Sequence, residues 1–263
     1  MSKPVETPHP PLHTFQIESL AVRVYPSQEQ LARDAALAAR NQLQEAIAKN
    51  GVATIILAAA PSQTQTLASL VALEGIDWSK VVMFHMDEYL GIDAEHPASF
   101  RRFLREHVQE KIRARSFHCL DGASSEPLDE CERYSQLLAA QPIDLCLLGI
   151  GENGHLAFND PPVADFADRH RVKLVKLEDA CRRQQVGEGH FPSIDAVPQY
   201  AFTLTIPALC AARRMLCVVP ERRKAASVRD ALRGPFSKNC PASVLRRQPH
   251  CTLYLDADSA ALI

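Results

Sequence analysis

Apolar runs of strand length alternate along the chain with segments that carry helix start and stop signals. The runs Val52 to Ala59 and Ile143 to Ile150 lack the regular polar alternation of a strand with one face in water. Such runs are typical of parallel strands that are covered on both faces. The segment from Ser27 to Asn50 has helical spacing, begins with a Ser-x-x-Gln capping box and is followed by Gly51. This alternation predicts an α/β fold with a doubly wound, mostly parallel sheet.

The same pattern continues to the end of the chain. We expect further strands at Val81–Met86, Val172–Val175, Phe202–Ile206, Met215–Val219 and Thr252–Leu255, and further helices from a second capping box at Ser62 and Gln65, from Pro97 to Arg113, from Asp129 to Ala140 and from Glu221 to Arg233. Residues 1–18 carry several prolines and are predicted to be an irregular lead-in. Residues 19–263 contain no repeat or linker and are predicted to form a single domain.

Composition and charge exclude several classes of function. The chain has 263 residues with a formal net charge of −2, so it has no electrostatic footprint for nucleic acid or an anionic membrane. No apolar run reaches the length of a membrane span, and the N-terminus lacks the apolar core of a signal peptide. The eight cysteines form no C-x-x-C pair, which disfavours a zinc ribbon and fits a reducing compartment. We therefore expect a cytoplasmic protein.

Acidic and imidazole side chains follow two of the predicted strands. Asp87 and Glu88 come directly after one strand, and His155 follows another. In doubly wound sheets ligands bind beyond the carboxyl ends of the strands, so these groups are expected around one crevice. Asp87 and Glu88 are neighbours in an extended segment and should point to opposite faces, one toward a ligand and the other into the loop. The alternative for each acid is a surface position in a loop.

His155 is placed in a loop that suits a functional histidine. Gly149, Gly151 and Gly154 allow close backbone approach, and Asp160 stands before two prolines that stiffen the chain. A carboxylate within reach can orient an imidazole and support its charge. A carboxylate base with a histidine suits the movement of protons in a sugar isomerisation and in ring opening. The alternative is a histidine that is hydrogen-bonded for structural reasons alone.

Two motifs resemble a known family. They are Phe84 to Gly91, followed by Glu95 to Phe100, and Gly149 to Pro161. Together they resemble the glucosamine-6-phosphate deaminases (isomerases), which share a Rossmann-like fold with 6-phosphogluconolactonases. The run Ala157-Phe158-Asn159 differs from the Ser-Leu-Phe run typical of the lactonase branch, which favours the deaminase branch.

The resemblance implies roles for individual residues. Asp87 would move a proton between carbons 2 and 1, and His155 would assist ring opening. Asp160 stands in place of the family's supporting glutamate, and Asn153 stands where family members carry aspartate or asparagine. These four are the predicted catalytic residues, and the predicted substrate-binding residues are Ser62, Gln63, Glu88, Gly154 and Lys224. The resemblance implies no metal and no organic cofactor.

The chain departs from the family in the segments that hold phosphate. The turn Ala58 to Thr64 replaces glycine by alanine and contains Pro61, which has no amide donor. Ser62 and the free amides of the following helix could still hold an anion, although a plain helix cap explains Ser62 equally well. Lys224 matches the family's phosphate-binding lysine, with a solvated lysine as the alternative. In the segment that corresponds to the family's mobile region, Arg182 and Arg183 are the candidates for its phosphate-binding arginine.

The leading hypothesis is deamination with aldose–ketose isomerisation, which turns glucosamine 6-phosphate and water into fructose 6-phosphate and ammonia. A 6-phosphogluconolactonase or a related sugar-phosphate hydrolase is the enzymatic alternative, and a non-catalytic sugar-phosphate sensor is the third hypothesis. The expected partner is a small-molecule sugar phosphate, with no nucleic acid and no membrane. A homo-oligomer remains open.

Overall fold

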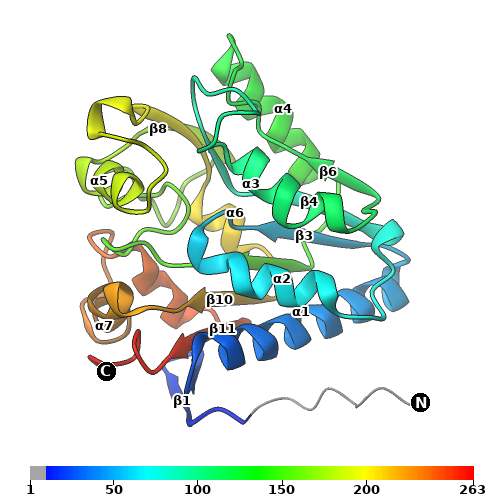
Figure 1. The fold of residues 1–263 in the computed structure, drawn as a ribbon, viewed down its shortest axis with the longest axis vertical. Helices are drawn as coiled ribbons and strands as arrows, with labels where there is room; N and C mark the ends of the chain where they lie inside the picture. Colours follow the sequence, from blue (N-terminus) through cyan, green and yellow to red (C-terminus); the bar gives the residue numbers. More distant parts are fainter. Residues whose placement is uncertain (1–9) are drawn as a thin grey trace.

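The computed structural model describes residues 10–263 and shows a mixed α/β fold around one large sheet (Figure 1). The large sheet has the strand order β1-β2-β11-β10-β7-β3-β4-β6, and all neighbours in it are parallel except β1 and β2. A smaller antiparallel sheet has the order β5-β9-β8. The strands are β1 (His13–Ile17), β2 (Leu20–Tyr25), β3 (Ala53–Leu57), β4 (Val81–His85), β5 (Asp87–Tyr89), β6 (Ser116–His118), β7 (Leu145–Leu148), β8 (Val172–Lys176), β9 (Tyr200–Leu204), β10 (Met215–Val219) and β11 (Cys251–Asp256).

Helices follow most strands of the large sheet. The α-helices are α1 (Gln28–Asn50), α2 (Thr64–Ala72), α3 (Phe100–His107), α4 (Pro127–Ala139), α5 (Asp179–Gly187), α6 (Ile206–Cys210) and α7 (Ala225–Arg233). Short 3-10 helices are η1 (Pro61–Gln63), η2 (Trp78–Lys80), η3 (Gln109–Lys111), η4 (Ile194–Ala196), η5 (Arg222–Lys224) and η6 (Pro241–Arg247).

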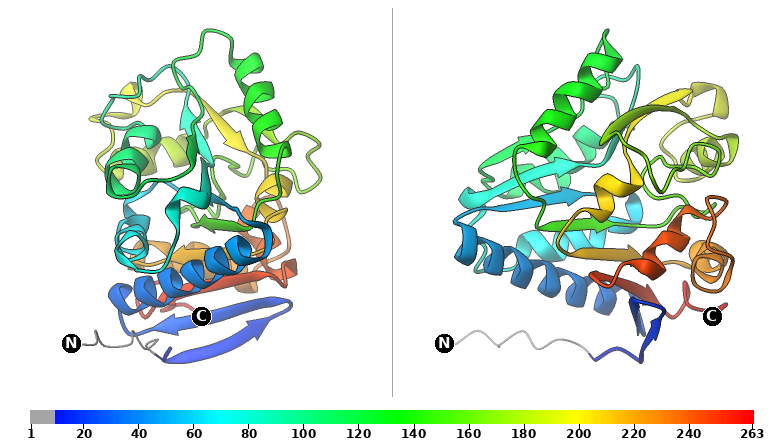
Figure 2. Two further views of the ribbon diagram at one scale, coloured as in Figure 1. Left: turned by 90° about the vertical axis from the view of Figure 1, so that its right-hand side faces the viewer. Right: turned by 180° about the vertical axis from the view of Figure 1, so that it is seen from behind.

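Both faces of the large sheet are covered by helices, as the two views in Figure 2 show. Every residue of β3 is buried. Ile55 and Leu57 pack in the apolar cluster that includes α1, α2 and α3, whereas Ile56 packs in the cluster that includes α4, α6 and α7. The prediction of a doubly wound, mostly parallel sheet is therefore confirmed, and the two buried faces explain why the strands are apolar without alternation.

The first long helix has the caps that the sequence predicts. The Ser27 hydroxyl accepts a hydrogen bond from the amide of Gln30 at 3.3 Å. Gly51 ends the helix in the left-handed conformation, with a φ of 74°, and its amide bonds to the carbonyl of Ile47. Local signals therefore set both ends of α1.

Several elements differ from their predictions. The strand β1 lies inside the predicted lead-in 1–18, whereas the rest of that prediction, residues 1–9, lies outside the described residues. The predicted helix from Pro97 is shorter, since α3 begins after a cap at Ser99. The prediction of a helix cap at Ser62 is wrong, because Ser62 lies within η1 and caps no helix. The strands β8 and β9, which were predicted, belong to the smaller sheet.

The topology brings four strand ends to one place. The chain runs outward from β3 to β4 and β6, and then returns to the other side of β3 as β7. The strands β10, β7, β3 and β4 are therefore neighbours, and the switch of direction lies between β7 and β3. Ligands of doubly wound sheets bind at such a switch point, beyond the carboxyl ends of the strands.

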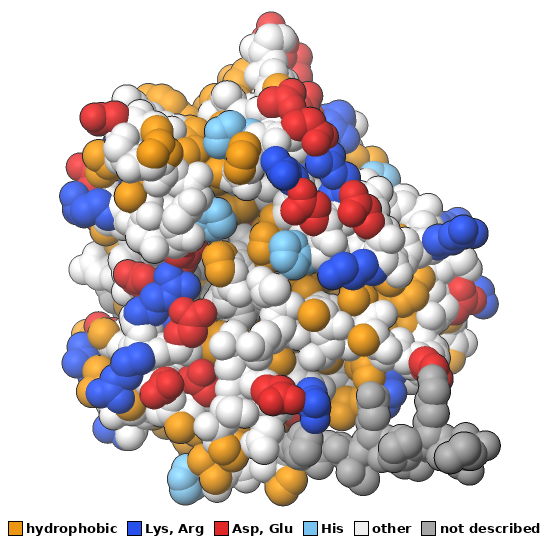
Figure 3. Space-filling model, viewed as in Figure 1, with side chains coloured by type: hydrophobic (Ala, Val, Ile, Leu, Met, Phe, Trp, Pro, Cys, Tyr) orange, Lys and Arg blue, Asp and Glu red, His pale blue; other side chains and the backbone are white. Residues whose placement is uncertain are grey.

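The surface shows no large area of one charge on the face that Figure 3 draws, where acidic and basic side chains are mingled. Within residues 10–263, no helix is long and apolar enough to cross a membrane. Neither observation points to a polyanion or a membrane as the partner.

Candidate active site

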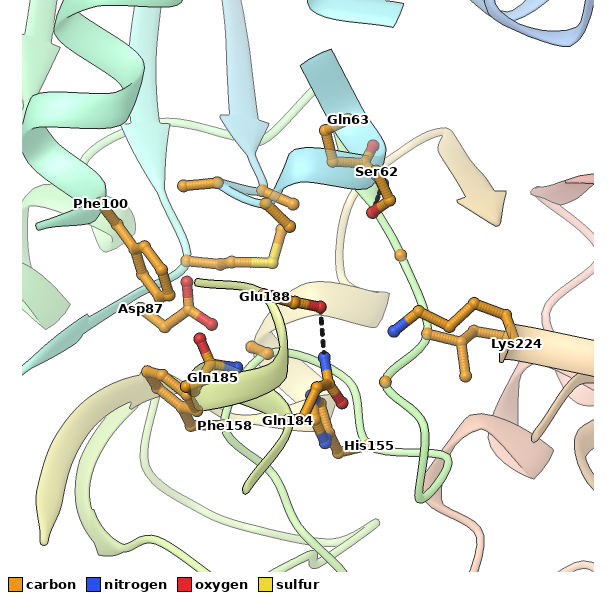
Figure 4. Close-up of a pocket in the computed structure, with 18 residues that line it drawn as sticks. Ser62, Gln63, Asp87, Phe100, His155, Phe158, Gln184, Gln185, Glu188 and Lys224 are labelled. Carbon is orange, nitrogen blue, oxygen red and sulfur yellow. Dashed lines mark hydrogen bonds between the residues drawn. The ribbon is translucent and has the colours of Figure 1, made fainter. Parts of the chain in front are cut away.

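A cavity lies at the carboxyl ends of β3, β4 and β7, beside the start of α7 (Figure 4). Its volume is about 70 Å³, and α5 with the residue after it forms part of its wall. Asp87 and Lys224 lie on opposite sides of it in Figure 4. We call the part around Asp87 and His155 the proton-transfer end, and the part around Ser62, Gln63 and Lys224 the anion end.

Asp87 is the first residue of β5 and directs its carboxyl group into the cavity. Phe100 and Phe158 flank it and leave the residue only 7% exposed. Burial, together with the charge of Glu88, raises the pKa of Asp87 well above its usual range. In the described part of the chain the carboxyl group takes part in no hydrogen bond or ion pair, so it is available to a ligand. The prediction that places Asp87 at the crevice is confirmed.

Glu88 points away from the cavity, as the alternation along β5 requires. It is fully buried, and its carboxylate accepts hydrogen bonds from the Ser99 hydroxyl at 2.8 Å and the Arg101 amide at 3.0 Å. It also accepts from the amide of Phe100 at 3.2 Å. Glu88 therefore anchors the start of α3. This placement corrects its assignment to substrate binding, because a carboxylate that is occupied by backbone amides outside the cavity has no free face for a ligand.

His155 lines the cavity with its ring in one orientation. Its Nδ1 lies 2.6 Å from Oδ1 of Asn153 and 3.1 Å from Oδ1 of Asp160. The Asn153 amide nitrogen already donates to Asp160 at 3.0 Å and to Glu178 at 2.8 Å, so its oxygen must face the histidine. Both neighbours of Nδ1 are then acceptors. We therefore place the proton of the neutral ring on Nδ1, which leaves Nε2 as the basic nitrogen.

The ring of His155 rests against Gly151. A Cβ atom at position 151 would lie 2.1 Å from Cε1 and 2.2 Å from Nε2 of the histidine. Only glycine leaves this space, so the glycine predicted to allow close approach does so to a side chain of the same loop. Gly154, predicted to bind substrate, lies outside the cavity in a turn with a φ of 82°.

Asp160 and Asn153 support the histidine from behind and do not line the cavity. Asp160 is fully buried, and its second carboxylate oxygen accepts from the amide of Glu178 at 3.2 Å. Burial alone would raise the pKa of Asp160, but hydrogen bonds from His155, Asn153 and the Glu178 backbone hold it below its usual value. The shorter side chain therefore reaches the histidine. Both residues act as positioning residues for His155, which is the supporting role that the resemblance implies for Asp160.

The only set of metal-binding side chains that the described residues bring together is His155, Asp160 and Cys181, with donor atoms within 4.8 Å of one another. His155 and Asp160 are already in contact through Nδ1 of the histidine, and the Cys181 thiol is hydrogen-bonded to Asp160. Burial raises the pKa of the Cys181 thiol well above its usual range, so it is a poor metal ligand at neutral pH. The proton-transfer end thus explains these side chains without an ion.

The anion end contains three of the predicted binding residues, Ser62, Gln63 and Lys224. The Gln63 side chain donates to the carbonyl of Val218 at 3.0 Å and to the Ser62 hydroxyl at 3.3 Å. Lys224 is only 3% exposed, yet within the described residues its ammonium group makes no hydrogen bond or ion pair. Burial lowers its pKa, although the charge of Glu188 acts against this. A buried cation that faces a cavity is a receptor for an anion.

Three further residues line the cavity that were not predicted from the sequence. They are Gln184 and Gln185 in α5 and Glu188 directly after it. Glu188 accepts hydrogen bonds from Gln184 at 2.9 Å and from Arg223 at 3.0 Å. Burial would raise its pKa, but His190, Lys224, Gln184 and Arg223 lower it to about 2. Glu188 is therefore ionised at neutral pH. No local sequence signal places this acid beside Lys224, because its position depends on partners distant in the chain.

The two arginines proposed for phosphate binding lie outside the cavity. Arg182 donates to the carbonyls of Ile194 and Val197 at 2.6 and 3.1 Å and so ties α5 to the loop around η4. Arg183 borders a separate hollow beside Glu152 and Arg223. The proposed substitution for the family's arginine is thus not supported by their positions.

Comparison with known proteins shows the family to which the sequence belongs. The family model described as glucosamine-6-phosphate isomerases/6-phosphogluconolactonase matches residues 26–254. The chain belongs to this family. Its relatives in it include a glucosamine-6-phosphate deaminase of Exiguobacterium sibiricum, 33% identical over 188 residues, which are 72% of this chain and 73% of that protein. The resemblance inferred from the two motifs is confirmed.

Solved structures share the fold of the chain. A monomeric glucosamine-6-phosphate deaminase matches with a TM-score of 0.85 and 29% identity, over 92% of this chain and 99% of that chain. A 6-phosphogluconolactonase of Shewanella baltica matches with a TM-score of 0.76 and 20% identity, over 92% of this chain and 100% of that chain. The second likeness concerns the fold alone.

Proposed function

We propose that the chain converts glucosamine 6-phosphate and water into fructose 6-phosphate and ammonia. The observation that carries this proposal is the pair of uncommitted groups at opposite ends of one cavity. Asp87 is a buried carboxyl group without a partner, and Lys224 is a buried ammonium group without one in the described residues. The named relatives in the family supply the substrate class.

His155 opens the sugar ring in this proposal. Its Nε2 takes the proton of the hydroxyl on carbon 1 and delivers it to the ring oxygen, so that the ring bond breaks and carbon 1 becomes an aldehyde. The imidazole of His155 is positively charged while it carries protons on both Nδ1 and Nε2. Asp160, at 3.1 Å from Nδ1, stabilises that charge.

Asp87 then moves one proton. Its carboxylate takes the proton from carbon 2 while the substrate's ammonium group gives a proton to the oxygen on carbon 1, which leaves a neutral enolamine between carbons 1 and 2. The carboxylic acid of Asp87 then returns its proton to carbon 1. The product is an iminium group at carbon 2, to which water adds before ammonia leaves. A raised pKa suits a group that must both take and give a proton near neutral pH.

The anion end receives the phosphate in this proposal. Lys224 supplies the charge, and Ser62 supplies a hydroxyl next to the start of α2. This arrangement differs from a glycine-rich turn, since Pro61 offers no amide and the side chain of Gln63 is occupied by Val218.

The test is direct. Purified protein is incubated with glucosamine 6-phosphate, and ammonia and fructose 6-phosphate are measured in the same sample. Equal amounts of ammonia and fructose 6-phosphate are expected. Hydrolysis of 6-phosphogluconolactone is followed in parallel, and no hydrolysis is expected. Hydrolysis of the lactone without release of ammonia would move the chain to the other branch of its family.

We also propose a cytoplasmic location, which the free state of all eight cysteines supports. We leave a homo-oligomer as a prediction for measurement. Light scattering at the concentration of the activity assay measures the oligomeric state.

A further inference from the structure

The cavity is closed in the structure at the side where α5 lies. Its volume of about 70 Å³ is well below the roughly 300–1,000 Å³ of pockets that hold small-molecule ligands. Gln184, Gln185 and Glu188 take up space on this side. The cavity therefore has to widen before it can hold a hexose phosphate, and these three side chains stand on one of its walls.

Glu188 differs from the other two residues because it carries a charge. Figure 4 shows its carboxylate on the side of the cavity that faces Lys224, and Gln184 donates a hydrogen bond to it. The Lys224 ammonium has no partner within hydrogen-bond reach among residues 10–263. Among the acids that raise the pKa of Lys224, Glu188 has the largest effect, and Lys224 in turn lowers the pKa of Glu188.

An anion that binds Lys224 meets this carboxylate. The phosphate of a sugar phosphate carries close to two negative charges, and like charges brought together in a buried site repel strongly. Ser62 and Gln63 add no positive charge at this end. Lys224 is the one lysine or arginine among the described residues that line the cavity, so a phosphate that binds while Glu188 is in place makes this end negative.

We propose that the carboxylate of Glu188 occupies the place of the substrate's anionic group, so that a phosphate binds Lys224 only after Glu188 has withdrawn. This inference rests on the proposed function, because it says how that same cavity admits a phosphorylated ligand. It makes Glu188 a residue that sets the affinity and the charge preference of the site.

The chain offers a place for the withdrawn carboxylate. Arg223 donates to Glu188 at 3.0 Å, and its side chain is 31% exposed, so it lies at the outer edge of the site. Gly187 and Gly189 flank Glu188, and neither has another atom within 4 Å of its Cβ position. The backbone around Glu188 therefore has room to move, and Arg223 can remain its partner outside the cavity.

The test compares Glu188→Gln with Glu152→Gln. Glu152 also contacts Arg223, at 3.5 Å, but does not line the cavity, so it is the matched control. Binding of inorganic phosphate is measured by titration calorimetry, which requires no turnover. We expect Glu188→Gln to bind phosphate about 10-fold more tightly than the wild type, since a like charge has been removed. Glu152→Gln should change the phosphate affinity much less, because the charge of Glu152 acts on Lys224 more weakly than that of Glu188.

A second measurement separates competition from a structural effect. Glu188→Gln should lower KM for glucosamine 6-phosphate and leave KM for unphosphorylated glucosamine unchanged. Glu188→Asp keeps the charge but draws it back by one methylene, so its phosphate affinity should fall between those of the wild type and Glu188→Gln. Melting temperatures of all three variants show that each is folded.

Three results would overturn the proposal. The first is that Glu188→Gln binds phosphate no more tightly than the wild type. The second is that neither the wild type nor Glu188→Gln binds phosphate. The third is that Glu188→Gln has a raised KM for glucosamine 6-phosphate, which would show that Glu188 contacts the amino sugar itself. Absence of deaminase activity alone would overturn the proposed reaction and leave the calorimetric comparison valid.

Discussion

The two ends of the cavity are built in different ways. At the proton-transfer end, Asn153 and Asp160 hold His155 through contacts of 2.6 and 3.1 Å, and all three lie in one loop after β7. At the anion end, Lys224 has no hydrogen bond or ion pair in the described chain, and the acid with the largest effect on its pKa is Glu188, which follows α5. One end is arranged before a ligand arrives. The other holds a buried ammonium group that has no bonded partner in the described chain until an anion binds.

This difference predicts which property of the protein a substitution at each end should change. A preorganised set of groups loses activity when a single group is displaced by a fraction of an ångström. Where a buried charge has no bonded partner, its removal lowers the affinity for the anionic ligand but stabilises the folded protein. Substitutions at the two ends should therefore separate effects on kcat, KM and folding.

The largest effect is expected from Asp87→Asn. Loss of the group that moves the proton should lower kcat roughly 1,000-fold. The melting temperature should rise, because a carboxyl group with a raised pKa opposes folding at neutral pH and the amide does not. Ammonia release and differential scanning calorimetry measure the two quantities. Turnover close to that of the wild type would remove Asp87 from the mechanism.

The second prediction concerns the space that holds His155. Gly151→Ala places a methyl group about where Cε1 and Nε2 of the histidine lie, so the ring must leave its position. We expect kcat to fall about 100-fold, the effect of a displacement of around 1 Å at a reacting group. The melting temperature of the variant shows that it is folded. Activity close to that of the wild type would show that the ring position is unimportant.

The third prediction tests the opposite end. Lys224→Met should raise KM for glucosamine 6-phosphate roughly 30-fold, since a hydrogen-bonded charge is lost from the complex, while kcat changes little. In the free protein the lowered pKa of Lys224 means that its charge opposes folding below that pKa. The melting temperature should therefore rise by roughly 2 °C. A fall in both stability and kcat would show that Lys224 is a structural residue.

The two ends also differ in how far the sequence predicts them. The strands were predictable because both of their faces are buried, as Ile55 and Ile56 show, and α1 was predictable from its caps. Asp87 and His155 follow such strands, so the switch-point rule brings them together. Their positions depend mainly on local structure.

The anion end depends on contacts between distant segments, which no local pattern records. Glu188 follows a short polar helix whose place is set by Arg182 and Arg223, each bonded to a separate part of the chain. The strand β5 has only three residues and forms because it pairs with β9, more than a hundred residues later. The strand β1 was missed because its residues are mostly exposed and follow several prolines.

The smallest effect is expected from Asp160→Asn. Asn153 still accepts a hydrogen bond from Nδ1 of His155, so the ring keeps its orientation and loses only the negative charge behind it. We expect kcat to fall about 10-fold, at the low end of what acid–base assistance contributes, with KM unchanged. A loss as large as that of Asp87→Asn would mean that Asp160 itself exchanges protons with the substrate.

The pH dependence of stability checks the same residue by a separate route. The pKa of Asp160 in the folded chain lies below its usual value of 3.8, so its ionised form stabilises the fold above that pH. This contribution is lost as the pH falls through the folded pKa. The melting temperature of the wild type should therefore exceed that of Asp160→Asn at pH 7, and the gap should narrow as the pH is lowered below about 4. A gap that stays constant down to pH 2 would show that packing, and not the charge beside His155, accounts for the stability that Asp160 provides.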